Sequence, residues 1–348
     1  MKLAINIGYS GAQMRLPLDL VLEVERLGYD SVWTAEAYGS DAVTPLAYLA
    51  AKTSRIKLGT GIMQIPGRTP AMCAMTMSTL DQLSGGRALV GLGLSGPQVV
   101  EGWHGVAYGK PAARTREYVE ILRKIWAREE PVAYDGEEYQ LPYHGPGATG
   151  LGKPLKSILH GRQLPVYLAT MGPVNIRATA ELADGWLPIW FSPQRMNLFR
   201  PALEEGFKRA GNGKSYKDFD IAAGCTVAVG NDVKALLAEM KPNLALYVGG
   251  MGAKEKNFHN EMARKYGYGD AAEKIQDLYL AGRKAEATEA VPDELCDEMS
   301  LCGPVERIKE RYRAWEDAGV STILVQAREP AALALMADIT GASKGATA

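Results

Sequence analysis

Short apolar runs alternate with longer amphipathic runs along this chain. Apolar runs of about four to eight residues, such as residues 3–8 and 29–35, are typical of buried strands. Between these two runs, a segment that starts near Pro17 and stops at Gly28 repeats apolar side chains at helical spacing. This pattern predicts a helix whose buried face is formed by Leu20, Val21, Val24 and Leu27.

The same alternation continues to the end of the chain and predicts the fold class. Strand-like runs occur eight times, at residues 3–8, 29–35, 56–61, 87–94, 164–170, 185–190, 220–230 and 321–326. The runs are apolar almost throughout and are followed by helical segments, which indicates a parallel sheet covered on both faces. Eight strands favour a closed (β/α)₈ TIM barrel, and an open doubly wound sheet is the alternative.

Two stretches interrupt this rhythm and are predicted to be insertions in one barrel domain spanning residues 1–348. Residues 128–163 contain VAYDGEEYQL, a sequence pattern that predicts a hairpin, followed by a loop rich in Gly and Pro. Residues 243–303 are expected to be mostly helical. Long excursions in a compact domain usually serve function or extra packing, so we expect both to shape the substrate pocket.

Composition and charge narrow the class of function. The formal net charge is -1, so the chain lacks the basic excess that nucleic-acid binding requires. No apolar run approaches the roughly 20 residues that span a bilayer, and the first residues do not resemble a signal peptide. The four cysteines are not spaced as a metal site, which suggests reduced thiols. We therefore expect a cytoplasmic protein that acts on a small molecule.

The residues that follow the predicted strands are mostly small or carry hydroxyl groups. In a barrel of this kind the active site lies at the carboxyl ends of the strands. The sequence places no cluster of His, Cys or Asp there for a metal, and it contains no nucleophile elbow. Gly59 and Gly61, in IKLGTGIM, mark a bulge or a close approach of backbone or ligand. Such a site suits a large flat cofactor that carries its own chemistry.

Three segments together resemble the bacterial-luciferase-like superfamily, in its branch of coenzyme F420-dependent oxidoreductases. They are LGYDSVWTAEAYGSDAVTPLAYLAAKTSRIKLGTGI (27–62), LDQLSGGRALVGLGLSGPQVVEGWHG (80–105) and LPVYLATMGPVNIRATAELADGW (164–186). The resemblance implies a luciferase-like TIM barrel that transfers a hydride between the deazaflavin and an organic substrate. It also implies a homodimer or a higher homo-oligomer. An FMN-dependent monooxygenase and a non-catalytic F420-binding protein are the alternatives.

The resemblance also assigns cofactor-binding residues. It implies a non-prolyl cis peptide at Gly61–Ile62, forming a bulge behind the central ring of the cofactor. The turn TMGP at residues 170–173 combines a flexible glycine with a proline at a first helical position, which leaves backbone N–H groups for an anion. In the family the equivalent region holds the cofactor's phosphate. The implied cofactor-binding set is Gly8, Glu36, Thr60, Gly61, Ile62, Ser95, Gly96, Ala169, Thr170, Met171, Gly172 and Pro173.

Glu36 and His104 are the candidate catalytic residues. Glu36 is a carboxylate directly after an apolar strand, where relatives keep a catalytic His or acid, so it is expected to exchange a proton. Its alternative role is to anchor a neighbouring loop. His104 reaches the site or packs beside Trp103. The sequence departs from several F420-dependent dehydrogenases at Pro97, where they carry a proton-donating Glu, which puts sugar-phosphate chemistry in doubt.

Overall fold

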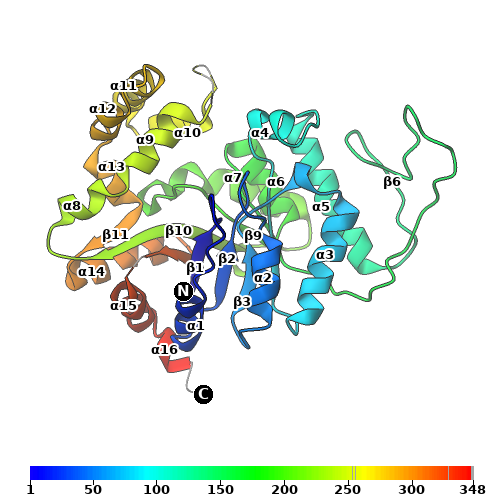
Figure 1. Ribbon diagram of the computed structural model, residues 1–348, viewed down its shortest axis with the longest axis horizontal. Helices are drawn as coiled ribbons and strands as arrows, with labels where there is room; N and C mark the ends of the chain where they lie inside the picture. Colours follow the sequence, from blue (N-terminus) through cyan, green and yellow to red (C-terminus); the bar gives the residue numbers. More distant parts are fainter. Residues whose placement is uncertain (253, 255, 328, 346–348) are drawn as a thin grey trace.

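Parallel strands close into a ring in the computed structural model, which describes residues 1–252, 254, 256–327 and 329–345 (Figure 1). Each barrel strand pairs with its neighbours in chain order, and the last strand pairs with the first, with Lys2 opposite Thr322. The eight strands of the ring are β1 (Lys2–Gly8), β2 (Ser31–Thr34), β3 (Lys57–Thr60), β5 (Ala88–Gly93), β8 (Val166–Leu168), β9 (Gly185–Trp186), β10 (Asp220–Val229) and β12 (Thr322–Gln326). The predicted TIM barrel is confirmed, and the open doubly wound sheet is wrong because the ring closes.

Several strands are shorter than the sequence predicted, among them β8, which covers Val166–Leu168 of the predicted 164–170. The sixth barrel strand, β9, ends at Trp186 rather than at Trp190. Pro188 lies in the missing part and has no N–H to donate to a neighbouring strand, and Trp190 adopts a left-handed backbone with φ 48°. The third strand ends at Thr60, and a separate two-residue strand, β4 (Met63–Gln64), pairs instead with the upper part of β5.

Amphipathic helices cover the outside of the barrel. Helix α1 (Leu18–Arg26) buries Val21 and Val24, as its pattern predicted. The helical segment that follows β9 is divided into the 3₁₀ turn η2 (Pro193–Leu198) and α7, with Pro201 in the first turn of α7. The other helices of this layer are α2 (Val43–Ala50), α3 (Pro70–Leu83), α5 (Pro111–Ala127), α6 (Pro173–Leu182), α7 (Arg200–Ala210), α14 (Val305–Asp317) and α15 (Pro330–Thr340). A six-residue helix, α4 (Pro97–Gly102), follows β5.

The first insertion contains the predicted hairpin. Its strands β6 (Tyr134–Asp135) and β7 (Gln140–Leu141) pair antiparallel. The Glu117 carboxylate on α5 accepts hydrogen bonds from three successive backbone N–H groups of the hairpin turn, those of residues 137–139. Beyond β7 an extended segment projects to the right in Figure 1. It returns to the barrel where Arg162 pairs with Asp81.

The second insertion is helical but ends in a strand that the sequence analysis did not predict. Its helices are α8 (Val233–Ala238), α9 (Lys241–Gly250), α10 (Phe258–Lys265), α11 (Gly269–Leu280), α12 (Lys284–Glu289) and α13 (Asp293–Glu298). The strand β11 (Ser300–Gly303) then pairs in parallel with the outer half of β10, residues 226–229. The predicted helical excursion at 243–303 is present, but its final strand was missed, because a four-residue strand acquires its partner only through the unusual length of β10.

We propose that residues 1–348 form one domain with these two insertions. A continuous core of buried side chains supports this proposal. It runs from Leu3 on β1 to Ala337 on α15, and it includes Leu244 and Val248 of the second insertion. The barrel interior holds a smaller cluster in which Trp33 and Tyr167 meet edge to face, with ring centroids 5.1 Å apart.

Glycines on the inner face of the barrel make room for Trp33 and for neighbouring backbone. A Cβ added at Gly59 would lie 2.5 Å from the Trp33 ring, and one added at Gly91 would lie 1.8 Å from the Thr60 carbonyl oxygen. Real Cβ atoms do not approach other atoms so closely. Gly59 in IKLGTGIM and Gly91 in RALVGLGL are thus required by packing inside the barrel, before any ligand is considered.

We predict that Gly59→Ala destabilises the protein by about 1–3 kcal/mol, because the Trp33 ring must move in a closely packed interior. Chemical denaturation followed by tryptophan fluorescence measures this change. Gly269→Ala is the matched control, since Gly269 opens α11 and has open space where a Cβ would be placed. Equal stability of the two variants would contradict the packing role of Gly59.

Candidate active site

The predicted site residues lie in the segments that follow five barrel strands. Gly8 ends β1, Glu36 follows β2, and Thr60 ends β3. Ser95 and Gly96 follow β5, and residues 169–173 follow β8. Because parallel strands present their carboxyl ends at the same end of a barrel, the fold brings all of these residues to one mouth. Their role in binding a cofactor stays a prediction.

The peptide bond Gly61–Ile62 is cis, as the family resemblance implied. The backbone around it is held on both sides. The Gly61 N–H donates to the Thr34 carbonyl at 2.5 Å, and the buried Thr60 hydroxyl bonds both the N–H and the carbonyl of Gly91 at 2.8 Å. Thr60 therefore contributes to the site through strand packing, since its hydroxyl is already committed to β5.

Ile62 closes the top of the barrel interior. Its side chain packs against the interior cluster that contains Trp33 and Tyr167. A Cβ added at Gly93 would lie 3.1 Å from the Ile62 side chain. The floor of the mouth is therefore an apolar side chain on a fixed backbone, with bare glycine backbone beside it.

Glu36 is almost fully enclosed, and both of its carboxylate oxygens accept hydrogen bonds. One oxygen accepts from the Gln64 N–H at 2.8 Å and from the Arg68 guanidinium at 2.6 Å. The other accepts from the Ala42 N–H at 3.1 Å. These contacts tie the loop after β2 to the segment after β4. They support the loop-anchor interpretation, while the catalytic role of Glu36 stays a prediction.

His104 belongs to a second series of hydrogen-bonded polar side chains, which lies beside Glu36. Its Nε2 lies 2.5 Å from the Gln64 Oε1, and the Gln64 amide donates to the Ser95 hydroxyl at 3.4 Å. A carbonyl oxygen only accepts, so the His104 proton is assigned to Nε2. His104 thus reaches the site through Gln64, whose backbone N–H also binds Glu36.

Gln64 and Arg68 are site residues that the sequence analysis missed. Both follow the cis peptide, in a stretch that the sequence pattern assigned to no element. The Arg68 carbonyl accepts a hydrogen bond from the buried Tyr118 on α5. Burial lowers the pKa of Arg68, but the hydrogen bond to Glu36 and the electrostatic effect of Glu36 and other nearby groups together raise the pKa above its usual value, so Arg68 stays charged. The signal available in the sequence was Gln64, a polar residue two positions after the predicted bulge.

The turn between β8 and α6 presents the start of a ten-residue helix to the mouth. Gly172, with φ 77°, precedes Pro173, and no side chain caps α6. A Cβ at Gly172 would meet nothing within 4 Å. The Thr170 hydroxyl lies 2.7 Å from the Thr179 hydroxyl, which fixes the turn against the helix. The N–H groups of the first helical turn have no intrahelical acceptors, so this end of α6 fits an anion.

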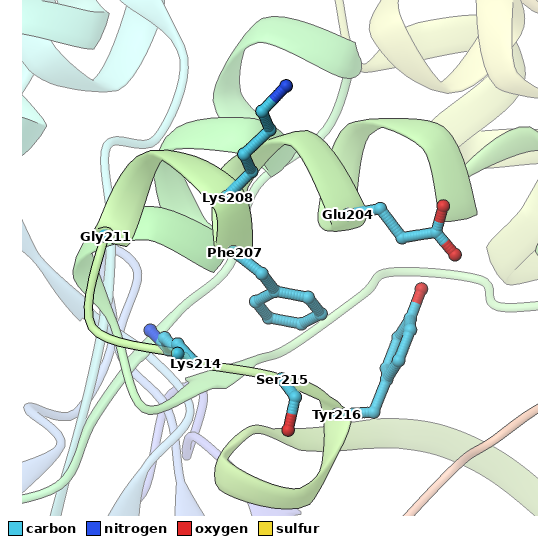
Figure 2. A pocket seen from close by; sticks show the side chains of 8 residues that line it. Glu204, Phe207, Lys208, Gly211, Lys214, Ser215 and Tyr216 are labelled. Carbon is cyan, nitrogen blue, oxygen red and sulfur yellow. The ribbon is translucent and has the colours of Figure 1, made fainter.

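Two cavities lie at the opposite end of the barrel. The larger one, about 530 Å³, is formed between α7 and the turn η3 (Tyr216–Asp218), with the Phe207 ring at its centre (Figure 2). The other, about 360 Å³, lies beside the end of α5 and includes Gln163. Their loops lead into the amino ends of β10 and β8, so neither cavity is the candidate active site.

Three structural observations accompany the site. Among the residues that the structure describes, no three His, Cys, Asp or Glu side chains are grouped to hold a metal. The four cysteines are buried and free, and burial raises the pKa of the Cys73 thiol to about 11. No helix in the described part of the chain has the length and apolar character needed to cross a membrane.

Comparison with known proteins identifies the family. Residues 6–322 match the family described as luciferase-like monooxygenase, and the chain belongs to this family. It is 48% identical over 330 residues to a putative coenzyme F420-dependent oxidoreductase of Mycobacterium tuberculosis, covering 94% of this chain and 95% of that protein. It is 29% identical to the 5,10-methylenetetrahydromethanopterin reductase of Archaeoglobus fulgidus, covering 86% of each.

A solved structure supports the fold. The coenzyme F420-dependent tetrahydromethanopterin reductase from Methanopyrus kandleri superposes with a TM-score of 0.76 over 97% of both chains, at 24% sequence identity. At this level of identity the similarity shows a shared fold, the barrel with its insertions, and nothing more. It agrees with the predicted luciferase-like (β/α)₈ architecture.

We predict that Glu36→Gln lowers the free energy of unfolding by about 1–3 kcal/mol, because the neutral amide weakens a charge-assisted bond to the half-buried Arg68. Urea denaturation measures this loss. Glu23→Gln is the control, since Glu23 forms an exposed pair with Arg26. A variant of unchanged stability whose hydride-transfer rate falls by about 10²–10⁴-fold would contradict the anchor and support a proton-transfer role.

Proposed function

We propose that this protein is a coenzyme F420-dependent oxidoreductase that transfers a hydride between the deazaflavin and a small organic substrate. The observation that carries the proposal is the mouth of the barrel. It combines an apolar floor at Ile62, bare backbone at Gly93, and the uncapped start of α6 at Gly172. These features fit a flat ring system that carries a phosphate. The name of the mycobacterial relative supports the same cofactor.

The cofactor supplies the hydride chemistry when it is bound, and the chain supplies position. In the proposal, the backbone bulge at Gly61–Ile62 supports the ring from behind. The first turn of α6, opened by Gly172, holds the phosphate with backbone N–H groups and with the positive end of the helix dipole. The remaining predicted contacts (Gly8, Glu36, Thr60, Ser95, Gly96, Ala169, Thr170, Met171 and Pro173) shape the walls between these two anchor points.

His104 is our preferred residue for proton exchange with the substrate, because both Glu36 oxygens are committed to holding the loop. The His104 proton at Nε2 is directed at Gln64. The other ring nitrogen, Nδ1, is therefore the atom that accepts or returns a proton. Glu36 then acts through Gln64, whose backbone it fixes.

The wider setting of this enzyme follows the expectations from sequence. We propose a cytoplasmic enzyme that works on a small molecule and not on nucleic acid or at a membrane. FMN is the alternative cofactor, and it would make the protein a flavin monooxygenase. A protein that binds F420 without turnover is the other alternative.

We expect wild-type protein to bind coenzyme F420 and to bind FMN more weakly, as measured by fluorescence titration of each cofactor. Gly172→Leu should weaken F420 binding at least about tenfold, since its side chain occupies the space given to the phosphate. Gly213→Leu is the matched control. Gly213 has nearly the same φ (76°) and equally open space, but it lies at the far end of the barrel.

Equal losses of affinity in both glycine variants would mean that backbone strain, rather than the phosphate site, explains the effect. Tight FMN binding with no F420 binding would overturn the cofactor assignment. F420 binding without oxidation or reduction of any substrate in a broad screen would support the non-catalytic alternative.

We also propose a homodimer or a higher homo-oligomer. Light scattering coupled to size-exclusion chromatography should give at least twice the 37.6 kDa mass of one chain. A monomer over the whole concentration range would refute this proposal.

A further inference from the structure

Three aromatic rings from distant parts of the chain form a mutual cluster, which we call the aromatic wall. Trp190 follows β9, Tyr247 lies on α9, and His259 lies in the first turn of α10. The ring centroids are 5.3 Å apart for Trp190 and Tyr247, 4.9 Å for Trp190 and His259, and 4.8 Å for Tyr247 and His259. The second insertion therefore places two rings, those of Tyr247 and His259, against Trp190 of the barrel.

Buried hydrogen bonds hold the aromatic wall in place. The Tyr266 hydroxyl donates to the Trp190 carbonyl at 2.9 Å, where the backbone is left-handed. The Asn257 amide donates to the Tyr247 carbonyl, and its oxygen accepts the His259 N–H at 2.9 Å. Tyr266 is 1% exposed and Asn257 is 3% exposed. The wall is thus a built surface and not a chance contact of mobile rings.

The aromatic wall lies on the side of the barrel where the candidate site lies. Figure 1 shows α4, α9 and α10 at the top of the view, where the strands end. Burial raises the pKa of Tyr247, and the nearby hydroxyls of Tyr9 and Tyr38 add to the increase. Tyr9 follows β1 and Tyr38 follows β2. Tyr247 therefore lies near the loops that follow these two strands.

The aromatic wall is uncharged, and the imidazole of His259 has no hydrogen-bond partner for its Nδ1 within the described residues. Burial lowers the pKa of His259 to about 4, so the ring is neutral near pH 7. Its Nδ1 is buried and has no hydrogen-bond partner within the described residues. A buried lone pair is better tolerated than a buried N–H, so the proton belongs on Nε2. That N–H is free to donate to a bound molecule.

We propose that the aromatic wall is the substrate-recognition surface of this enzyme, and that it selects an uncharged planar ring compound whose carbonyl oxygen accepts a hydrogen bond from His259. The inference rests on the proposed function and names the substrate class for that site. Rings favour stacked or edge-on ring partners. A carboxylate or phosphate beside three neutral rings would lose its hydration without a counter-charge.

The test uses 2-cyclohexen-1-one as the probe, with acetone and 3-oxocyclohex-1-ene-1-carboxylate as comparisons. In this reaction the β-carbon gains a hydride from reduced F420 and the α-carbon gains a proton, so the double bond is reduced while F420 is oxidised. We expect wild-type kcat/KM for the cyclohexenone to exceed that for each comparison compound at least about tenfold, as followed by F420 absorbance. Equal use of the carboxylate would overturn the proposal.

Two variants separate ring packing from the hydrogen bond. Tyr247→Ala removes a ring, and His259→Phe keeps a ring but removes the donor. Each should lower kcat/KM for the cyclohexenone about tenfold, with F420 affinity unchanged. His160→Phe, at an exposed position of the first insertion, is the control and should match wild type. If neither variant changes kcat/KM, the proposal is wrong.

A binding measurement on the protein without cofactor keeps the inference separate from the proposed function. Saturation-transfer NMR should detect 2-cyclohexen-1-one on wild-type protein and on His160→Phe, and should lose the signal in Tyr247→Ala and His259→Phe. If F420 does not bind but this pattern appears, the proposed function fails and the wall is supported. If F420 binds and all four proteins give the same transfer, only the wall is overturned.

Discussion

The site depends on how closely the β2, β3 and β5 backbones approach one another at the top of the barrel. Thr60 bonds both polar groups of Gly91, and the next N–H reaches the Thr34 carbonyl. These contacts are possible only because Gly91 has no side chain, since a Cβ there would overlap the Thr60 carbonyl oxygen. The strand thus reaches the bulge at Ile62 on a fixed path. The positions of the residues that follow Ile62, including Gln64 and Arg68, depend on these contacts between Thr60, Gly91 and Thr34.

Glu36 fixes the loops beside these strands in the same way. It accepts hydrogen bonds from two backbone segments and from Arg68, so the loop after β2 cannot move independently of the segment after β4. Gln64 then carries the same constraint to His104 and Ser95. A side chain with hydrogen bonds to both of its oxygens in such a place stabilises geometry first. Any part it has in proton transfer would act on a framework that it also builds.

The barrel could be predicted from the sequence because each strand and helix carries its own local pattern. Helix α1 is an example, since its observed bounds, Leu18–Arg26, lie within the segment from Pro17 to Gly28 that the pattern predicted. The turn at Gly172 could also be predicted, because Gly followed by Pro has a local meaning. Strand β11 could not, since four residues acquire a partner only when β10 runs past the barrel. The aromatic wall was missed because its three rings are far apart in sequence and meet only through the fold.

The pairing of β11 with the outer half of β10 has a consequence for how such enzymes diversify. The chain leaves the barrel at the end of β10 and returns on a strand that is hydrogen-bonded to that same end. The exit and entry points of residues 230–299 therefore lie at the two ends of one four-residue stretch of β10, residues 226–229. A segment with both ends fixed to one stretch of strand is a module in the engineer's sense, because it can be lengthened or exchanged without shifting the register of any barrel strand. Under the proposed function, substrate preference can change within this module while the end of the barrel that carries Ile62 and Gly172 keeps its structure.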